Sequence, residues 1–354
     1  MTALPFTFEP LPTRVIFGPG SRDQLTAEVQ RLGVRRALVL STPGQAGRAG
    51  ELAARLGDLA AGTFSGAVMH TPLRVTEQAL DRARHLRADG LVAFGGGSTT
   101  GLSKAIALRT DLPQLILPTT YAGSEMTPIL GETQGGRKTT RRTQAVLPET
   151  VIYDVELTLT LPPAVSASSG VNAVAHAAEA LYARNGNPVT TLMAEEALRA
   201  LSQALPVIVR EPQNPEARSQ AMLGAWLAGS VLGSVDMALH HKLAHVLGGT
   251  FNLPHAELHA ALLPHTIAYN APAVPAAVQR MARALGTRDA AQGLYELNRT
   301  LGIEPALQAL GMPERGLSQA AALAVQAPYP NPAPLEERAL LALLRRAWAG
   351  DPPQ

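Results

Sequence analysis

The sequence predicts an α/β N-terminal domain followed by an all-α C-terminal domain. The first observation is an alternation of strand-like and helical patterns in the first half of the chain, which is typical of a parallel sheet with helices on its faces. The second is that strand-like runs stop after residue 161. The third is the turn Leu161-Pro162-Pro163, which separates the two patterns. We therefore expect domains at residues 1–160 and 161–354.

The expected elements follow in chain order. Apolar strand-like runs lie at residues 14–17, 37–40, 91–94, 115–117 and 151–153, and the helical patterns between them lie at 24–31, 76–87 and 102–108. The alanine- and leucine-rich second half has helical periodicity at 168–184, 191–204, 215–247, 256–270, 275–285, 290–301 and 336–348.

Composition excludes several kinds of chemistry. The 354 residues include no cysteine, which removes disulfides, thiolate metal sites and cysteine nucleophiles. The net charge is +2, and the short basic run at 137–142 has no interleaved aromatic residues, unlike a nucleic-acid site. The first ten residues lack the pattern of a signal peptide. We expect a cytoplasmic homodimer that acts on a small molecule, with no nucleic-acid or membrane partner.

A glycine-rich turn follows the strand-like run 91–94. It reads Gly95-Gly96-Gly97-Ser98-Thr99-Thr100-Gly101 and leads into a helical pattern. A strand, a glycine turn and a helix start form an anion site, because backbone N–H groups point outward and the helix dipole favours phosphate. The turn departs from the usual dinucleotide fingerprint, so a tight packing turn remains the alternative.

A second turn, at residues 118–125, carries the hydroxyls of Thr119, Thr120 and Ser124 past the end of another strand. Ligands of open α/β sheets bind at such carboxyl ends, so the two turns together indicate a nucleotide site. Ser41 ends the strand-like run 37–40, where an acidic residue would hold the ribose of NAD. Since no carboxylate is present there, NADH and NADPH both remain open. Tyr121 either lines the substrate pocket or packs.

Lysine occurs only at Lys104, Lys138 and Lys242, and arginine fills every other basic position. A chain that otherwise uses arginine has reason to keep lysine where a compact ammonium is needed. All three lysines are therefore candidate site residues, with chance placement as the alternative.

Histidines cluster near the middle of the second half. Six of the nine lie within residues 240–265, at His240, His241, His245, His255, His259 and His265. His241 and His245 are four residues apart on a predicted helix, as are Asn172 and His176 on another, so each pair shares a face. Three well-spaced histidines with a helical partner suggest a metal site, but the partner is an amide where a carboxylate is expected. We expect His259 and His265 to be packing residues, while His240 is either a carboxylate anchor or solvated.

Together these segments resemble the iron-containing (group III) alcohol dehydrogenase superfamily, and within it the maleylacetate reductases. The stretches that carry the resemblance are GGGSTTGLSKAIAL, LPTTYAGSEMTPI, LPETVIYDVELTLTLP, SGVNAVAHAAEALYA and HHKLAHVLGGTFNLPHAELHAALLPH. The resemblance implies a dehydroquinate-synthase-like fold, with a dinucleotide-binding α/β domain and a helical catalytic domain.

The resemblance also implies roles for particular residues. It assigns cofactor contacts to Gly95, Gly96, Gly97, Ser98, Thr119, Thr120, Ser124 and Lys138, to which we add Ser41 and Lys104. Gly101 stands where the superfamily usually has an aspartate. The positions that bind iron or zinc in metal-dependent members correspond to Asn172, His176, His241 and His255, and His245 matches a positioning histidine.

Without the aspartate, the metal site loses its one anionic ligand, so we expect a cationic pocket rather than a metal. The implied substrate is maleylacetate, a small dicarboxylate, and the implied reaction is reduction of its C=C bond to 3-oxoadipate by NADH or NADPH. We expect His176, His241, His245, His255 and Lys242 to act in catalysis, and Asn172, Tyr121 and His240 to bind the substrate. If a metal is present, its ligands are His176, His241 and His255.

Three other functions remain as alternatives. A metal-dependent alcohol or polyol dehydrogenase has the same superfamily pattern. A dehydroquinate-synthase-type lyase shares the fold but needs the missing carboxylate. A non-enzymatic nucleotide-binding module would leave the clustered histidines unexplained.

Overall fold

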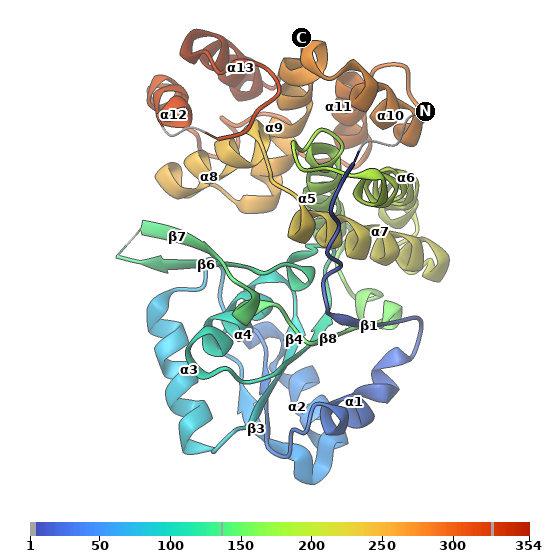
Figure 1. Cartoon of the computed structure of the whole chain (residues 1–354), viewed down its shortest axis with the longest axis vertical. Helices are drawn as coiled ribbons and strands as arrows, with labels where there is room; N and C mark the ends of the chain where they lie inside the picture. Colours follow the sequence, from blue (N-terminus) through green and yellow to red (C-terminus); the bar gives the residue numbers. More distant parts are fainter. Residues whose placement is uncertain (1–4, 136, 327–328) are drawn as a thin grey trace. The chain divides into compact units, whose positions relative to one another are not determined.

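The computed structural model describes residues 5–135, 137–326 and 329–354. It divides the chain into two compact units. One comprises Leu11–Leu161, and the other comprises Pro162–Gln354 together with the N-terminal segment up to Pro10. The expected fold class, an α/β region followed by a helical region, is confirmed (Figure 1).

The N-terminal unit is built on a parallel sheet in the order β1-β8-β5-β4-β2-β3. The strands are β1 (Arg14–Phe17), β2 (Ala37–Leu40), β3 (Ala60–Phe64), β4 (Gly90–Gly95), β5 (Gln114–Pro118) and β8 (Thr150–Tyr153). The helices are α1 (Leu25–Arg31), α2 (Ala46–Leu56), α3 (Leu73–His85) and α4 (Gly97–Thr110). The central strands β2, β4 and β5 are buried along their whole length, as expected for strands with both faces covered.

Sheet topology explains where the two predicted turns meet. β4 pairs with β5 so that Gly95 lies opposite Pro118, and the backbone N–H of Thr119 donates to the carbonyl of Gly95 at 3.1 Å. The chain leaves β2 toward β3 at one edge but leaves β4 toward β5 in the opposite direction. Open α/β sheets bind ligands at the carboxyl ends of the strands where the order reverses, which here are β2 and β4.

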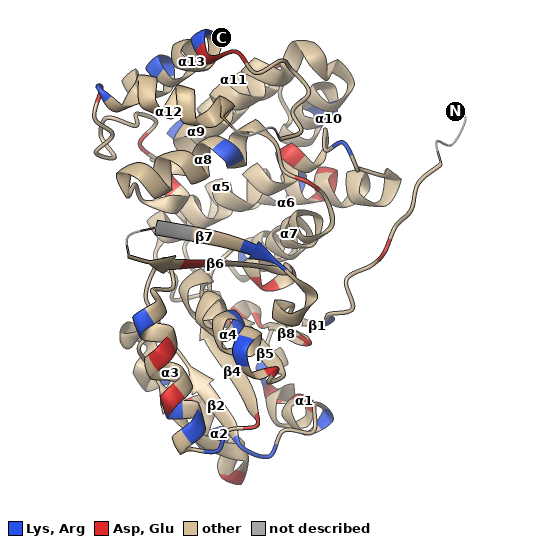
Figure 2. Ribbon diagram, turned by 60° about the vertical axis from the view of Figure 1, so that its left-hand side comes forward, with Lys and Arg blue, Asp and Glu red and all other residues tan. Residues whose placement is uncertain are grey.

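One helix and three strands of this unit were absent from the sequence prediction. They are α2, the edge strand β3, and the antiparallel hairpin of β6 (Ile129–Gln134) and β7 (Arg137–Arg142). β3 reads Ala-Ala-Gly-Thr-Phe, and alanine and glycine have low strand propensity. Pairing along β2 makes it a strand. Basic and acidic residues are interspersed along the helices of this unit (Figure 2).

The C-terminal unit is helical. Its helices are α5 (Pro163–Ala180), α6 (Pro188–Arg210), α7 (Pro215–Ser234), α8 (Leu239–Phe251), α9 (His255–Asn270), α10 (Pro275–Leu285), α11 (Ala290–Thr300), α12 (Gly316–Val325) and α13 (Glu337–Ala349). Several begin with proline at a first-turn position, where its missing N–H costs no helical bond. Asn187 and Asn214 cap α6 and α7 through their side-chain oxygens.

The helix predicted over 215–247 is two helices. α7 ends at Ser234 and α8 begins at Leu239, with a bend of 94° between them. α8 also continues past Gly248 and Gly249 and ends at Phe251, and the capping residue Asn252 takes a left-handed φ of 53°. The bend therefore places His240 and His241 in the first turn of a new helix. Within the described residues, no single helix is long and apolar enough to cross a membrane, although α7 and α8 taken together reach that length and composition.

Candidate active site

The glycine turn lies between β4 and α4. A Cβ on Gly95 would lie 2.4 Å from Oγ1 of Thr99, and one on Gly96 would lie 2.7 Å from Cγ2 of Thr120. Gly97 differs, because its nearest neighbour would be Oγ of Ser124 at 3.8 Å. Gly95 and Gly96 are thus required by packing. A Cβ on Gly97 would make only ordinary van der Waals contacts, so packing does not require glycine there, at the start of α4 where helix N–H groups lack intrahelical partners.

The hydroxyls around this turn fall into two groups. Thr119 is already engaged, since its Oγ1 accepts from the Gln45 amide at 3.0 Å. Oγ of Ser124 and Oγ1 of Thr99 are buried and have no hydrogen-bond partner among the described residues. Unsatisfied buried hydroxyls are rare and call for an explanation. A phosphate or nicotinamide group bound at this turn would supply the missing partners.

Lys104 supports the second turn from inside. Its side chain is buried, and its ammonium donates to the carbonyls of Ser124 (2.5 Å), Thr127 (2.6 Å) and Ile129 (3.0 Å) and to Oγ1 of Thr127 (2.9 Å). Burial lowers the pKa of Lys104 to about 7, and the charge of Glu125 partly opposes this. Lys104 therefore lies beneath the second turn, residues 118–125, which we call the hydroxyl turn. There it orders the backbone that carries Ser124.

Two other predicted residues of this unit are also buried. Ser41 ends β2 as expected, but its hydroxyl donates to Oγ of Ser65 at 2.9 Å. Tyr121 is fully buried in the N-terminal unit. Gly101 stands at the position usually held by aspartate, and a Cβ there would lie 2.5 Å from Oγ1 of Thr71. A larger side chain at residue 101 would therefore displace Thr71.

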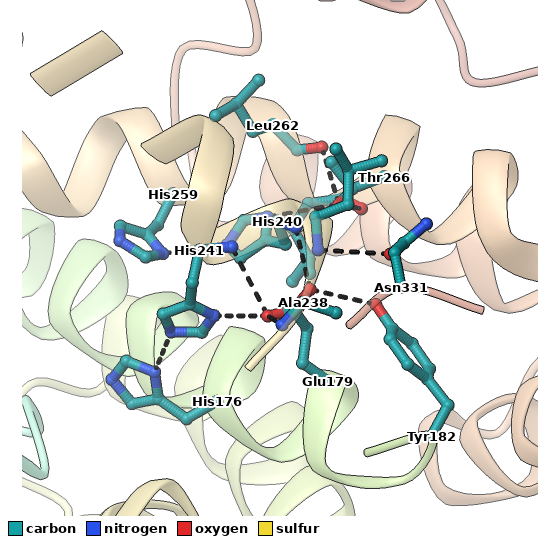
Figure 3. Close-up of polar contacts among 12 residues, drawn as sticks. His176, Glu179, Tyr182, Ala238, His240, His241, His259, Leu262, Thr266 and Asn331 are labelled. Atoms are coloured by element: carbon teal, nitrogen blue, oxygen red, sulfur yellow. Dashed lines mark hydrogen bonds and ion pairs between the residues drawn. The ribbon is translucent and has the colours of Figure 1, made fainter. Parts of the chain in front are cut away.

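The histidine cluster is assembled from three helices of the C-terminal unit (Figure 3). Its first hydrogen-bonded chain starts on α5, where the amide Nδ2 of Asn172 lies 3.2 Å from Nε2 of His176. Nδ1 of His176 lies 2.8 Å from Nε2 of His241 on α8. Nδ1 of His241 in turn lies 2.7 Å from Oε2 of Glu179, back on α5. The shared helical face predicted for Asn172 and His176 is confirmed, and both ring nitrogens of His176 and of His241 have partners inside the cluster.

Glu179 anchors this chain and was missed by the sequence analysis. Its carboxylate is fully buried and accepts from the backbone N–H groups of Ala238 (2.9 Å) and His240 (2.8 Å) at the start of α8, and from the Tyr182 hydroxyl at 3.4 Å (Figure 3). Burial acts to raise its pKa, but the hydrogen bond from His241, with the hydrogen bond from the Ala238 backbone, outweighs it and lowers the pKa to about 2. The available signal was its position three residues after His176, on the same helical face.

A second hydrogen-bonded chain runs behind the first. Oγ1 of Thr266 lies 3.2 Å from Nδ1 of His240, and Nε2 of His240 lies 2.8 Å from Nδ1 of His259 on α9. Burial lowers the pKa of His240 to about 3, with a further contribution from His241. Burial and the neighbouring His255 also lower the pKa of His259. Both rings are therefore neutral near pH 7, and His240, predicted to touch substrate, lies fully buried with both nitrogens bonded.

The remaining predicted residues lie nearer the surface. His245 is exposed on α8, and its ring centroid lies 6.5 Å from that of His241. His255 is half-buried at the start of α9, with its ring centroid 4.4 Å from that of His259. Lys242 is half-buried, and its ammonium lies 5.5 Å from the ring centre of Tyr329. His245, His255 and Lys242 are the predicted catalytic residues of this unit that solvent reaches.

Models of one protein family match both halves of the sequence. The family model for iron-containing alcohol dehydrogenase matches residues 12–155, and the model for the C-terminal part of the Fe-containing alcohol dehydrogenase family matches residues 166–348. The chain belongs to the iron-containing alcohol dehydrogenase family. Membership supports a nicotinamide cofactor, and the resemblance inferred from the sequence motifs is confirmed.

Individual members of the family are similar over their whole lengths. Maleylacetate reductase of Sphingobium indicum is 58% identical, with 98% of this chain and 99% of that protein covered. The crystal structure of maleylacetate reductase from Rhizobium sp. strain MTP-10005 is 56% identical, with a TM-score of 0.95 and 99% of each chain covered. That from Agrobacterium tumefaciens is 54% identical, with a TM-score of 0.95, and covers 99% of this chain and 100% of its own.

The family's metal can be tested against the residues at its positions. Two nitrogens bound to one tetrahedral Zn²⁺ stand about 3.3 Å apart, and both must present lone pairs. Nδ1 of His176 and Nε2 of His241 are 2.8 Å apart and share a hydrogen. Asn172 supplies an amide N–H to the same chain instead of a carboxylate. In the described residues, no three His, Asp or Glu side chains are grouped to hold a metal ion. The donor set as folded does not fit the metal.

The nicotinamide cofactor does fit the N-terminal unit. Gly97 at the start of α4, where no side chain covers the backbone, and the hydroxyls of Thr99 and Ser124, which have no partner among the described residues, would together hold its phosphates. Lys138 lies in β7 opposite Thr133, and its side chain is outside the described residues. Its role in cofactor binding stays a prediction.

Proposed function

We propose that this chain is a maleylacetate reductase, which uses NADH or NADPH to reduce the C=C bond of maleylacetate and form 3-oxoadipate without a metal ion. The observation that carries the proposal is identity of 58% and 56% to two maleylacetate reductases over nearly all of each chain. The histidine cluster supports the metal-free part, because Asn172 donates a hydrogen bond where a metal site needs an anionic ligand.

The substrate sets the chemical requirements. Maleylacetate is a dianion whose C=C bond is conjugated to a ketone. The reduced nicotinamide, when bound, supplies a hydride to the alkene carbon β to that ketone. The chain itself must then hold the carboxylates, stabilise the enolate oxygen and deliver one proton to carbon.

The solvent-accessible side chains of the cluster suit these tasks. His245, His255 and Lys242 can each donate a hydrogen bond from nitrogen to a carboxylate or enolate oxygen. The imidazoles behind them, His240 and His259, are buried with lowered pKa values, so they add bulk and dipoles without adding buried charge. We propose that the proton donor is His245 or His255, since solvent can reprotonate either ring after each turnover.

Asn172 contributes by removing a negative charge. A carboxylate at residue 172 would repel a substrate carboxylate by about 4 kcal/mol at 4 Å and an effective dielectric constant of 20. The amide avoids this repulsion. An uncharged residue 172 thus favours a dianion over a neutral alcohol, which separates the proposed reductase from a metal-dependent alcohol or polyol dehydrogenase.

We propose that both reduced cofactors are accepted. Ser41 ends β2 where a carboxylate would bind the ribose hydroxyls of NADH and repel the 2′-phosphate of NADPH. Its hydroxyl bonds to Ser65 and carries no charge, so neither cofactor is excluded electrostatically.

The test is an absorbance assay at the reduced-nicotinamide band. Purified protein is given maleylacetate with NADH or NADPH, with and without a strong chelator, and the metal content of the same sample is measured. We expect turnover with both cofactors that the chelator leaves unchanged. Activity that requires stoichiometric iron or zinc, or oxidation of simple alcohols in place of maleylacetate reduction, would favour the metal-dependent alternative. Light scattering on the same sample tests the expected homodimer.

A further inference from the structure

Glu179, His241, His176 and Asn172 form a hydrogen-bonded chain. At its Glu179 end, the donor and the acceptor of the hydrogen bond can be assigned. Every group that bonds the Glu179 carboxylate is a donor: the backbone N–H groups of Ala238, His240 and His241, the hydroxyl of Tyr182, and Nδ1 of His241. An ionised carboxylate can only accept, so the hydrogen between Glu179 and His241 belongs to Nδ1 of His241.

The two ends together determine the rest of the chain. At the other end, the amide nitrogen Nδ2 of Asn172 can only donate, so Nε2 of His176 is a lone pair. An imidazole keeps at least one hydrogen, so His176 carries it on Nδ1 and donates it to a lone pair on Nε2 of His241. His241 therefore has its hydrogen on Nδ1, as the contact with Glu179 also requires. The amide of Asn172 is turned with its nitrogen toward His176. Its Oδ1 is buried and has no hydrogen-bond partner in the described residues.

We propose that Glu179 is a positioning residue, which holds His241 and His176 as their Nδ1–H tautomers and thereby leaves Oδ1 of Asn172 as an acceptor for a hydroxyl of the bound ligand. The role rests on the proposed function, but the tautomers do not. It also refines that function: Asn172 suits the hydroxyl of an enol, formed when the proton adds first to the enolate oxygen and then passes to the α carbon, so that one proton is delivered in all. It does not suit a carboxylate, which has no hydrogen to donate.

Counting hydrogens explains why Glu179 and Asn172 belong together. The chain has three hydrogen bonds, and two neutral imidazoles supply two hydrogens. The amide of Asn172 supplies the third, so the chain is complete without a buried positive charge. With aspartate at residue 172, both ends of the chain would accept, and one bond would lack its hydrogen unless an imidazole were charged. A carboxylate at Glu179 therefore requires an amide donor at residue 172.

The first experiment reads the tautomers directly. Two-dimensional ¹H–¹⁵N spectra of histidine-labelled wild-type protein distinguish Nδ1–H from Nε2–H rings, and the variants His176→Gln and His241→Gln assign the two signals. We expect both residues to be neutral Nδ1–H tautomers. An Nε2–H tautomer at either residue in the wild type overturns the inference, and this measurement needs no variant of Glu179 to fold.

The second experiment links the tautomers to turnover. Glu179→Gln offers an amide that can donate as well as accept, so the tautomers of His241 and His176 lose their fixed order. We expect kcat for maleylacetate to fall roughly 10- to 100-fold while KM for NADPH stays within about twofold, as when a residue that orients a functional imidazole is lost. Glu179→Asp, which restores the carboxylate, should recover part of kcat.

Tyr182→Phe is the matched control. It removes a long 3.4 Å contact to Oε1 of the same carboxylate but leaves the bond from Oε2 to His241. We expect wild-type tautomers and near-wild-type kcat. Unchanged kcat and tautomers in folded Glu179→Gln would overturn the inference. If the wild type does not reduce maleylacetate at all, the proposed function fails, and the tautomer spectrum still decides the hydrogen-bond order.

Discussion

Oε2 of Glu179 on α5 lies 2.7 Å from Nδ1 of His241 on α8. The same carboxylate also accepts the backbone N–H groups of Ala238 and His240, so one side chain both fixes the start of α8 and orients its histidine ring. His241 continues a hydrogen-bonded chain through His176, and at its other end Asn172 donates to His176. A helix start, two imidazoles and an amide are thus ordered by a single buried charge.

Asn172→Asp tests the charge of the cluster. The added carboxylate restores the anionic ligand of the family's metal site and repels a dianionic substrate. We expect more zinc retained after gel filtration and at least a tenfold lower kcat/KM for maleylacetate, which corresponds to about 1.4 kcal/mol. Asn187→Asp, at the α6 cap, adds the same charge away from the histidines and should change neither quantity. A rise in metal-free activity for Asn172→Asp would contradict the electrostatic argument.

Gly97→Ala separates cofactor binding from packing at the glycine turn. The new methyl group would meet no protein atom closer than 3.8 Å, so the fold should tolerate it, but it occupies the space that we assign to the cofactor phosphates. We expect an unchanged melting temperature and a KM for NADPH raised roughly tenfold, measured by steady-state kinetics. Gly50→Ala, on an open face of α2, is the control and should leave KM unchanged. Wild-type KM in Gly97→Ala would place the phosphates elsewhere.

Lys104→Met tests whether this lysine is a support for the hydroxyl turn. The substitution leaves the carbonyls of Ser124, Thr127 and Ile129 without their buried donor. We expect the free energy of unfolding in urea to fall by on the order of 3 kcal/mol. Lys242→Met removes a half-buried ammonium that lies over the Tyr329 ring, and should cost only about 0.5–1 kcal/mol. Equal costs for the two variants would show that Lys104 has no special structural role.

His265→Phe tests the acid stability of the helical unit. Burial, followed by the charge of Arg346, lowers the pKa of His265 to about 4 from an unfolded value near 6.5. Between these pH values the unfolded chain binds the proton and the folded one does not, so the contribution to stability is complete above pH 6.5 and is lost as the pH falls to 4. The loss is on the order of 3 kcal/mol. Urea unfolding between pH 4 and 7 should show a shallower pH dependence for the variant. An identical dependence would mean that His265 is not the titrating group.

The sequence by itself determined the fold class and the family. Hydrophobic periodicity is local, so the central strands and most helices could be recognised from it, and the glycine and histidine motifs identified the family. The edge strand β3 and the hairpin β6–β7 could not be recognised from it. β3 is stabilised by pairing with β2, which is distant in the sequence, and β6 and β7 pair with each other although their apolar patterns are weak. The break between α7 and α8 was hidden for a similar reason: the apolar pattern is continuous across it, while Glu179 supplies the new helix start from α5.

The same distinction holds for the site. Sequence spacing placed Asn172 beside His176 and gathered the histidines, because residues four apart on a helix share a face. Only the tertiary structure decided which nitrogen of each ring meets which partner. In the tertiary structure His176 faces His241, His240 is buried against His259, and Glu179 bonds to His241 at the end of the hydrogen-bonded chain. Hydrogen-bond partners on different helices are set by how those helices pack, and no local pattern in the sequence records that packing.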